Sequence, residues 1–323
     1  GAKIICNPSA SNEVIGKSDY RRKLVSMQSA KLLCSYLYAD AGLGESTQDL
    51  VFSGHSIIAE NGTILSESKR YSTGLTFNDI DLKRLVHERK RITTFGNSSG
   101  VEFEKVLFDI KINNVTKLVR TFPKKPFVPS NSDRLKERCE EILSMQATAL
   151  ATRIKHIGCK NIILGLSGGL DSTLALIVCV RAYNILSMNL KDIIAVTMPG
   201  FGTTNHTKNN SIALTEAYGV TLKDISIVDS VSQHFKDISH ESSVHDVAYE
   251  NSQARERTQI LMDLANKHNG IVVGTGDLSE LALGWATYNG DHMSMYGVNC
   301  SVPKTLVRFI VSFEAENVAT SNP

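Results

Sequence analysis

The segment that most constrains the fold is a glycine-rich turn between an apolar strand and a buried helix. Residues 161–164 are an apolar run of strand length, and residues 173–180 continue as a buried helix would. The turn between them, residues 165–172, reads Gly-Leu-Ser-Gly-Gly-Leu-Asp-Ser. Such a turn leaves backbone N–H groups unpaired at the positive end of a helix dipole, which suits a phosphate group. The alternative is an ordinary glycine-rich turn with a serine cap.

The residue types in this turn differ from those of a Walker A loop. That pattern ends in Gly-Lys-Ser/Thr, whereas this turn has no lysine and carries Asp171. A carboxylate beside a polyphosphate needs a divalent cation that takes oxygen ligands from both. Gly168 and Gly169 let the backbone approach an anion, and Ser167 and Ser172 add hydroxyl donors. Ser172 is also a candidate helix cap. The turn therefore predicts a nucleotide with Mg²⁺.

Composition narrows the class of protein. The 323 residues are enough for two domains, and 42% hydrophobic with 21% charged residues is typical of a globular chain. A net charge of +2 favours neither nucleic acid nor membrane as a partner. No apolar run is long enough to span a bilayer. The six cysteines form no Cys-x-x-Cys motif, so we expect a reducing cytoplasm.

Three closely spaced prolines mark a domain boundary. Pro123, Pro126 and Pro129 form a stiff connector, which we place at residues 121–131 between domains at 1–120 and 132–323. The sequence begins Gly-Ala-Lys-Ile-Ile-Cys, with neither Met nor a signal-peptide pattern, and we expect it to be part of a longer protein.

The second domain alternates predicted strands and helices. Strands are expected at 161–164, 192–198, 222–227 and 270–274, with helices at 132–157, 173–180, 205–218 and 250–268. This alternation predicts a doubly wound parallel sheet, in which ligands bind beyond the carboxyl ends of the strands. The turns at 165–172, 199–202 and 274–277 should then meet at one edge.

The first domain gives weaker patterns. We expect a strand at 3–7, helices at 19–39 and 76–92, and a possible strand at 101–110. Residues 56–59 and 63–66 flank Glu60-Asn61-Gly62, which predicts a β-hairpin.

Polar residues that follow the strands are candidates for the site. Glu280 is a candidate second ligand for the cation held by Asp171, or the acidic first turn of an ordinary helix. Asn251 and Arg255 share a helix face that suits a phosphate or carboxylate, or a solvated face. His240 and His245 do not match the His-Glu-x-x-His zinc motif, because their spacing is one residue too long, and this argues against a zinc site there.

Two aromatic residues and two charged ones complete the candidates. Trp285 and Tyr288 lie on a glycine-bounded loop and suit stacking on a flat heterocycle, or core packing. Asp291 and Lys304 follow without a visible partner and, taken singly, are typical of a surface.

Four segments of the second domain resemble the synthetase domain of glutamine-dependent NAD⁺ synthetases, in the N-type ATP pyrophosphatase superfamily. They are Ser-Gly-Gly-Leu-Asp-Ser at 167–172, Met-Pro-Gly-Phe-Gly-Thr at 198–203, Tyr-Glu-Asn-Ser-Gln-Ala-Arg-Glu-Arg at 249–257, and the run from Gly-Thr-Gly-Asp to Tyr-Asn-Gly-Asp at 274–291. The first is shared across the superfamily, and the last two together are specific. The similarity runs from about residue 133 to 308, and implies an adenine nucleotide alpha hydrolase-like sheet.

The first domain resembles the later half of a nitrilase-like glutaminase domain, with an α/β/β/α fold. Residues 7–11 (Asn-Pro-Ser-Ala-Ser) and 42–50 (Gly-Leu-Gly-Glu-Ser-Thr-Gln-Asp-Leu) carry this resemblance. It implies that the family's Glu–Lys–Cys triad lies upstream of Gly1 and that the synthetase domain continues beyond Pro323. Ser11 and Lys17 stand at positions implied to contact glutamine.

The resemblance implies ATP-dependent amidation of deamido-NAD⁺ to NAD⁺ through an adenylate, with ammonia supplied from glutamine. It implies ATP and Mg²⁺ as cofactors, no nucleic acid or membrane partner, and a homo-oligomer in the intact enzyme. The alternatives are another ATP pyrophosphatase, of the tRNA-thiolating type, or a non-catalytic module. The implied residues are Gly165, Leu166, Ser167, Gly168, Gly169, Leu170, Asp171, Ser172 and Thr275 for ATP; Asn251, Arg255, Glu280, Trp285, Ala286, Thr287 and Tyr288 for deamido-NAD⁺; Asp171 and Glu280 for the metal; and Asp291 and Lys304 for catalysis.

Overall fold

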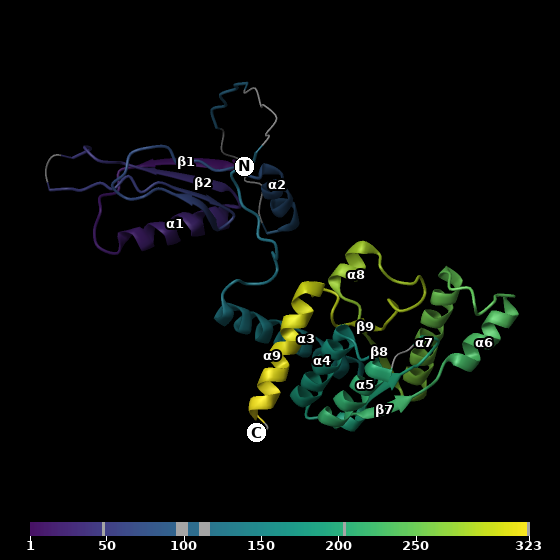
Figure 1. Cartoon of the computed structure of the whole chain (residues 1–323). Coiled ribbons are helices and arrows are strands. Elements are labelled where there is room, and N and C mark those ends of the chain that lie inside the picture. The colour runs from purple at the N-terminus through teal and green to yellow at the C-terminus, as the bar shows by residue number, and fades with distance from the viewer. Residues whose placement is uncertain (47–48, 95–102, 110–116, 203–204, 322–323) are drawn as a thin grey trace. The chain divides into compact units, whose positions relative to one another are not determined.

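The computed structural model describes residues 1–46, 49–94, 103–109, 117–202 and 205–321. The chain divides into two compact units, Gly1–Pro123 and Lys124–Pro323 (Figure 1). The predicted linker at 121–131 and the domain limits around it stay predictions. Over the described residues, no helix combines the length and apolar character that crossing a membrane requires.

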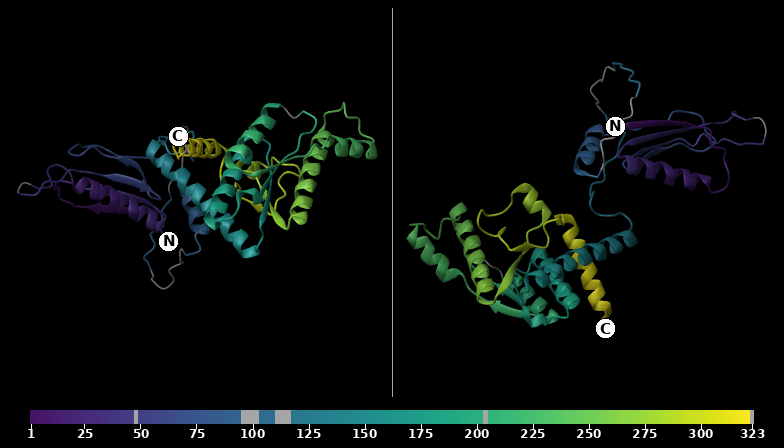
Figure 2. Two further views of the ribbon diagram at one scale, coloured as in Figure 1. Left: turned by 90° about the horizontal axis from the view of Figure 1, so that it is seen from below. Right: turned by 180° about the vertical axis from the view of Figure 1, so that it is seen from behind.

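The first unit is a four-stranded sheet with a helix along one face. Strand β1 (Ile4–Ser9) pairs in parallel with β2 (Ser35–Asp40), while β3 (Ile57–Glu60) and β4 (Thr63–Glu67) continue the sheet antiparallel. Helix α1 (Lys17–Leu32) joins β1 to β2 and covers the sheet (Figure 2). Its Val25 packs against Tyr38, Ile57 and Ala59 in a small buried core. The predicted hairpin is confirmed, and both turn residues have positive φ, 44° at Asn61 and 84° at Gly62.

Three predictions for this unit differ from the structure. The helix expected at 19–39 is wrong beyond Leu32, because Leu33 adopts a left-handed φ of 47° that ends it. The next residues pair with β1 and β3 and form β2. The helix expected at 76–92 covers only α2 (Leu82–Arg91), since Asp81 caps its first turn. The strand expected at 101–110 is wrong for residues 103–109, which have no regular structure; the rest of it lies outside the described residues.

The second unit is a five-stranded, all-parallel sheet. Its order is β7 (Thr221–Asp224), β6 (Ile193–Thr197), β5 (Asn161–Gly165), β8 (Gly270–Gly274) and β9 (Tyr296–Gly297). The strand order reverses between β5 and β8, which is where doubly wound sheets bind their ligands. The predicted doubly wound parallel sheet is confirmed.

Helices cover both faces of this sheet (Figures 1 and 2). Because side chains alternate along a strand, Ile162 and Leu164 enter one core while Ile163 enters the other. The first core is completed by α3 (Ser132–Ile157), α4 (Leu170–Leu186), α5 (Asn205–Tyr218) and α9 (Lys304–Ser321). The second is completed by α6 (Val228–Asp237) and α7 (Val247–Lys267). The remaining helices are short, η1 (Leu190–Asp192) and α8 (Leu278–Leu283).

Within this unit the sequence missed β9, α6 and α9, whereas α8 agrees with the alternative interpretation of Glu280 as part of a helix start. The strand expected at 222–227 ends at Asp224, because Ile227 turns into the core and its N–H bonds the carbonyl of Pro199. The predicted helix at 132–157 is confirmed with the same limits, capped by Asn131.

Candidate active site

The glycine-rich turn after β5 is compact and internally hydrogen-bonded. The Ser167 and Ser172 hydroxyls lie 3.1 Å apart, and Ser172 Oγ donates to the Gly169 carbonyl at 3.1 Å. The N-cap of α4 is Gly169, with no side-chain cap, so the prediction that Ser172 caps the helix is wrong. Ser172 is instead the third helical residue, and its hydroxyl points back into the turn. The first N–H groups of α4 thus remain available to a ligand.

Gly168 allows the turn to pass close to α5. Its φ is 79°, a left-handed value that favours glycine. A Cβ atom at this position would lie well inside van der Waals contact with the Thr207 carbonyl oxygen. The glycine is therefore required both by backbone conformation and by space.

Three carboxylates gather around one ammonium group beside this turn. Lys304 Nζ lies 2.5 Å from Asp171 Oδ2, 3.3 Å from Asp277 Oδ2 and 3.6 Å from Glu280 Oε1. Burial disfavours the charged lysine, but its hydrogen bond and charge attraction to Asp171, with the other two carboxylates, outweigh this and raise the pKa of Lys304. Lys304 is thus cationic at neutral pH.

The cluster of three carboxylates, Asp171, Asp277 and Glu280, has the composition of a site for a divalent cation. One oxygen from each of Asp171, Asp277 and Glu280 lies within 4.8 Å of the others. Among the described residues, Asp171 Oδ1 is buried with no hydrogen-bond partner, and the buried Asp277 Oδ2 has the Lys304 ammonium 3.3 Å away as an ion-pair partner. Buried carboxylate oxygens without donors are suited to Mg²⁺, which prefers oxygen ligands. The structure thus brings together the two predicted metal ligands and adds Asp277.

Glu280 and Asp277 also form a helix cap, so the helix-start interpretation of Glu280 is confirmed, and its role as a cation ligand stays a prediction. Asp277 Oδ1 accepts from the N–H groups of Ser279 and Glu280, while Glu280 Oε2 accepts from the Asp277 N–H. This capping box leaves Asp277 Oδ2 and Glu280 Oε1 on the side of Lys304.

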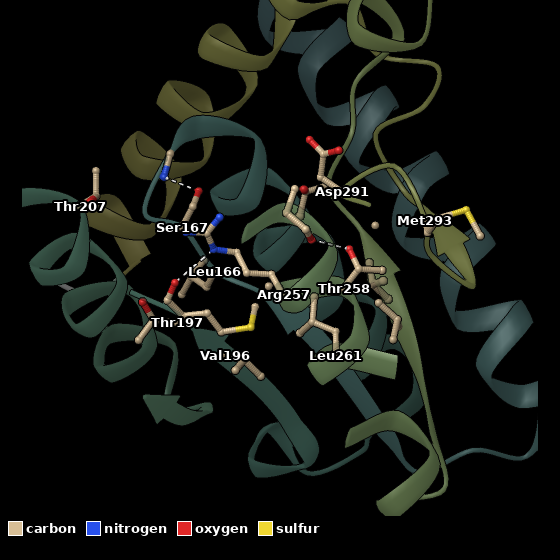
Figure 3. Close-up of a pocket in the computed structure, with 18 of the residues that line it drawn as sticks. Leu166, Ser167, Val196, Thr197, Thr207, Arg257, Thr258, Leu261, Asp291 and Met293 are labelled. Carbon is tan, nitrogen blue, oxygen red and sulfur yellow. Dashed lines mark hydrogen bonds between the residues drawn. The ribbon is translucent and has the colours of Figure 1, made fainter. Parts of the chain in front are cut away.

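A pocket of about 510 Å³ opens at the carboxyl ends of β5, β6 and β8 (Figure 3). Its floor is apolar, with Val196, Met198, Leu261 and Val272, which suits a flat heterocycle. Of the predicted ATP residues, Gly165, Leu166, Ser167, Gly169 and Thr275 line it, whereas Gly168, Leu170, Asp171 and Ser172 do not.

The pocket is also lined by a positively charged side chain, Arg257, which the sequence analysis did not name as a site residue. Its Nε donates to the Met198 carbonyl at 3.2 Å (Figure 3). Burial lowers the pKa of Arg257, while the charges of Glu250 and Asp291 act in the opposite direction. Arg257 lies two residues after the predicted Arg255, so helical spacing alone placed it on another face.

The residues assigned to deamido-NAD⁺ meet around the loop after α8. Thr287 Oγ1 donates to Asn251 Oδ1 at 2.8 Å, and Arg255 Nε donates to the Tyr288 carbonyl at 3.1 Å. Asp291 accepts from the Thr287 N–H at 2.7 Å and also lines the pocket. Both residues contact this loop, but Asn251 is half-buried whereas Arg255 is exposed, so the ligand-binding interpretation of this helix face stays a prediction beside the solvated-face alternative.

The two aromatic rings of this loop are accessible. Trp285 is 79% exposed and Tyr288 78%, so neither packs in a core. Ala286 lies between Trp285 and Thr287 and is also exposed. Their stacking on a heterocycle stays a prediction.

In the first unit, Ser11 lies in the short loop between β1 and α1, and Lys17 is the first residue of α1. The Ser11 N–H donates to Asp40 Oδ1 at 2.8 Å, and Lys17 Nζ donates to the Asn12 carbonyl at 2.6 Å. Buried Arg21 supports the loop through an ion pair with Glu13 at 2.9 Å. Burial acts to raise the pKa of Glu13, but hydrogen bonds from Ser53 and Arg21 outweigh it and lower the pKa.

Fold and site together define an α/β protein with a nucleotide-sized pocket, a phosphate-type turn and a carboxylate cluster at the switch point of a doubly wound sheet. A family model described as NAD synthase matches residues 142–311, just over half of the chain. The chain belongs to the NAD synthase family. This membership favours NAD⁺ synthesis over the tRNA-thiolating alternative.

Individual relatives agree with this assignment. The chain is 42% identical over 326 residues to the glutamine-dependent NAD(+) synthetase of Mycobacterium tuberculosis, covering 96% of this chain and 48% of that protein. It is 28% identical to that of Aquifex aeolicus, covering 95% and 52%. The chain thus spans about half the length of the curated relatives it matches.

A solved structure has the same fold. Glutamine-dependent NAD⁺ synthetase from Acinetobacter baumannii, in complex with ADP, aligns with a TM-score of 0.52 at 23% identity, covering 99% of this chain and 54% of that one. Because the alignment includes both units, it supports the predicted α/β fold class for the whole chain.

Proposed function

We propose that the chain carries the ATP-dependent amidation of deamido-NAD⁺ to NAD⁺, as part of a glutamine-dependent NAD⁺ synthetase, a carbon–nitrogen ligase. The observation that carries this proposal is the convergence of Asp171, Asp277, Glu280 and Lys304 beside the glycine-rich turn. Adenylation depends more on neutralising the negative charge of the phosphates than on covalent catalysis. Carboxylates beside a phosphate-binding turn would contribute by holding the divalent cation that provides this neutralisation.

In the first step, the nicotinate carboxylate oxygen of deamido-NAD⁺ bonds to the α-phosphorus of ATP while the bond to pyrophosphate breaks. Gly165, Leu166, Ser167 and Gly169 line the pocket, and we assign them to the phosphates, with Ser167 as a hydroxyl donor. Asp171, Asp277 and Glu280 would hold Mg²⁺, which supplies positive charge to the leaving pyrophosphate when bound. The Lys304 ammonium supplies further positive charge for the same oxygens.

In the second step, ammonia attacks the carboxyl carbon of the adenylate, AMP leaves, and the amide forms. We propose that Asp291 orients the ammonia, because it lines the pocket and is fixed by the Thr287 N–H. Asn251, Arg255, Glu280 and the loop at 285–288 are assigned to deamido-NAD⁺.

The first unit is assigned to the glutamine-hydrolysing part, with Ser11 and Lys17 at the glutamine site. The two relatives described above are glutamine-dependent NAD(+) synthetases, which supports this assignment. A cytoplasmic location, a homo-oligomeric intact enzyme and the lack of nucleic acid or membrane partners are part of the same proposal.

Exchange of labelled pyrophosphate into ATP tests the proposal directly. With Mg²⁺ and deamido-NAD⁺, the chain should catalyse exchange, and added ammonium should yield NAD⁺. Replacing deamido-NAD⁺ by NAD⁺ is the control, because NAD⁺ lacks the attacking carboxylate and should support no exchange. No exchange, together with a silent titration by ATP and Mg²⁺, would favour a non-catalytic module.

A further inference from the structure

We propose that Asn299 is a positioning residue that fixes the distance between the phosphate-binding turn and the carboxylates following β8. The proposal rests on the function proposed above and extends it to a residue that does not touch the substrates. Asn299 lies between β9 and α9 and is fully buried.

The Asn299 amide joins two loops that are far apart in sequence. Its Nδ2 donates to the Asp171 carbonyl at 2.9 Å and to the Thr275 carbonyl at 3.1 Å. An amide NH₂ group has two donor hydrogens, and here each bonds a different loop. Asp171 stands in the first turn of α4, while Thr275 follows β8.

A second amide holds Asn299 in this orientation. Gln146, on α3, donates from Nε2 to the Val298 carbonyl at 2.7 Å and to Asn299 Oδ1 at 3.2 Å. Because Gln146 presents its NH₂ group, Asn299 must present its oxygen to Gln146 and its NH₂ group to the two carbonyls. The α3 helix thereby sets the direction of the bonds to both loops.

These bonds act on the carboxylate cluster through the backbone. Asp171 carries one cluster carboxylate, and Thr275 lies two residues before Asp277, which carries another. Both carboxylates contact Lys304, at 2.5 and 3.3 Å. Since cation ligands must be held to within a few tenths of an ångström, a fixed distance between the two backbones is needed for Mg²⁺. The Asn299 bonds supply that constraint.

The test is a calorimetric titration of the full chain with ATP plus Mg²⁺, and separately with adenosine. Asn299→Asp keeps the oxygen that faces Gln146 and replaces the donor to both carbonyls by a second oxygen. We expect its affinity for ATP–Mg²⁺ to fall at least about tenfold, and that for adenosine to change less than about twofold. Adenosine has no phosphates, so it does not depend on the cation.

The matched control is Asn161→Asp. Asn161 Nδ2 donates to the His268 carbonyl at 2.9 Å, at the opposite, amino end of β5. This variant loses the same kind of bond far from the turn, and both affinities should remain within about twofold of the parent. A folded Asn299→Asp protein with unchanged ATP–Mg²⁺ affinity overturns the proposal. An equal loss for adenosine also overturns it, because that shows general damage to the pocket.

If the Asn299→Asp variant does not fold, the Gln146→Met variant tests the positioning role of Asn299 instead. It leaves Asn299 in place without its orienting donor, and ATP–Mg²⁺ affinity should fall about threefold at constant adenosine affinity. A folded Gln146→Met protein with unchanged affinity contradicts the positioning role. A parent chain that does not bind ATP–Mg²⁺ at all overturns the proposed function itself, which distinguishes the two failures.

Discussion

Single side chains in this site have more than one role, and Lys304 is the clearest case. Its ammonium contacts three carboxylates and offsets part of their negative charge, and its raised pKa keeps it charged across the neutral range. It is half-exposed, and we propose that it turns toward a bound phosphate when a cation replaces it among the carboxylates. Under this proposal the same residue stabilises the free site and takes part in the reaction.

Gly168→Ala tests whether the turn needs glycine at the residue scale. The added methyl group would collide with the Thr207 carbonyl, and the left-handed φ of 79° adds backbone strain. We expect a loss of about 2–3 kcal/mol in the free energy of unfolding, measured with urea. The matched variant is Gly169→Ala, where a Cβ meets only Ser167 Oγ at 3.4 Å. It should cost less than about 1 kcal/mol. Equal costs for the two variants would contradict the packing described for the turn.

At the scale of elements, three helices on one face of the second sheet are held by a shared ion network. Arg181 on α4 bonds Glu140 on α3 at 2.8 Å and Glu314 on α9 at 2.6 Å. Burial opposes its charge, but the two carboxylates outweigh this and raise the pKa of Arg181. Since Glu314 is nearly buried, it depends on Arg181 for a partner.

Arg181→Leu should therefore destabilise the second unit. It leaves the Glu314 carboxylate buried without its cation, and we expect a cost of about 3 kcal/mol in urea unfolding. Arg138→Leu is the control, because the Arg138–Glu141 pair on α3 is more than half exposed at both ends. That variant should cost less than about 1 kcal/mol. A cost for Arg181→Leu as small as that of the control would show that the network does not stabilise the helices.

Strands and helices were predictable from the sequence where their own residues show a clear hydrophobic pattern or a helix cap. The apolar strands β5, β6 and β8 and the capped helix α3 follow from runs, alternation and a cap, and the sequence predicts them well. Strand β2 was missed because residues 19–39 were predicted to be one helix. In the structure Leu33 ends that helix, and only pairing with β1 and β3 defines the strand. Two-residue β9 has no local signal.

Site residues that belong to a local sequence motif were predictable from the sequence. Asp171 and Glu280 were expected to share a cation, and the structure places them together. Arg257, Asn299 and the cluster role of Asp277 depend on contacts between segments far apart in sequence, which spacing along one helix or turn cannot reveal.

At the scale of the whole molecule, the parallel sheet of the second unit brings the candidate site residues together at the carboxyl ends of its strands. Segments after β5, after β6 and after β8, the loop after α8, helix α7 and the start of α9 contribute to the pocket and the carboxylate cluster, because parallel strands end on the same side. No single segment contains the site. Contacts between segments, such as those of Gln146 and Asn299, are therefore needed to hold its loops together.

The most direct test of this account measures ATP binding with Mg²⁺ and with the metal removed by chelation, for the parent and for Asp171→Asn. We predict that the parent binds ATP at least about tenfold more tightly with Mg²⁺, and that Asp171→Asn, while folded, loses this difference. The same enhancement by Mg²⁺ in parent and variant would contradict the claim that Asp171 joins the nucleotide to a cation at this turn.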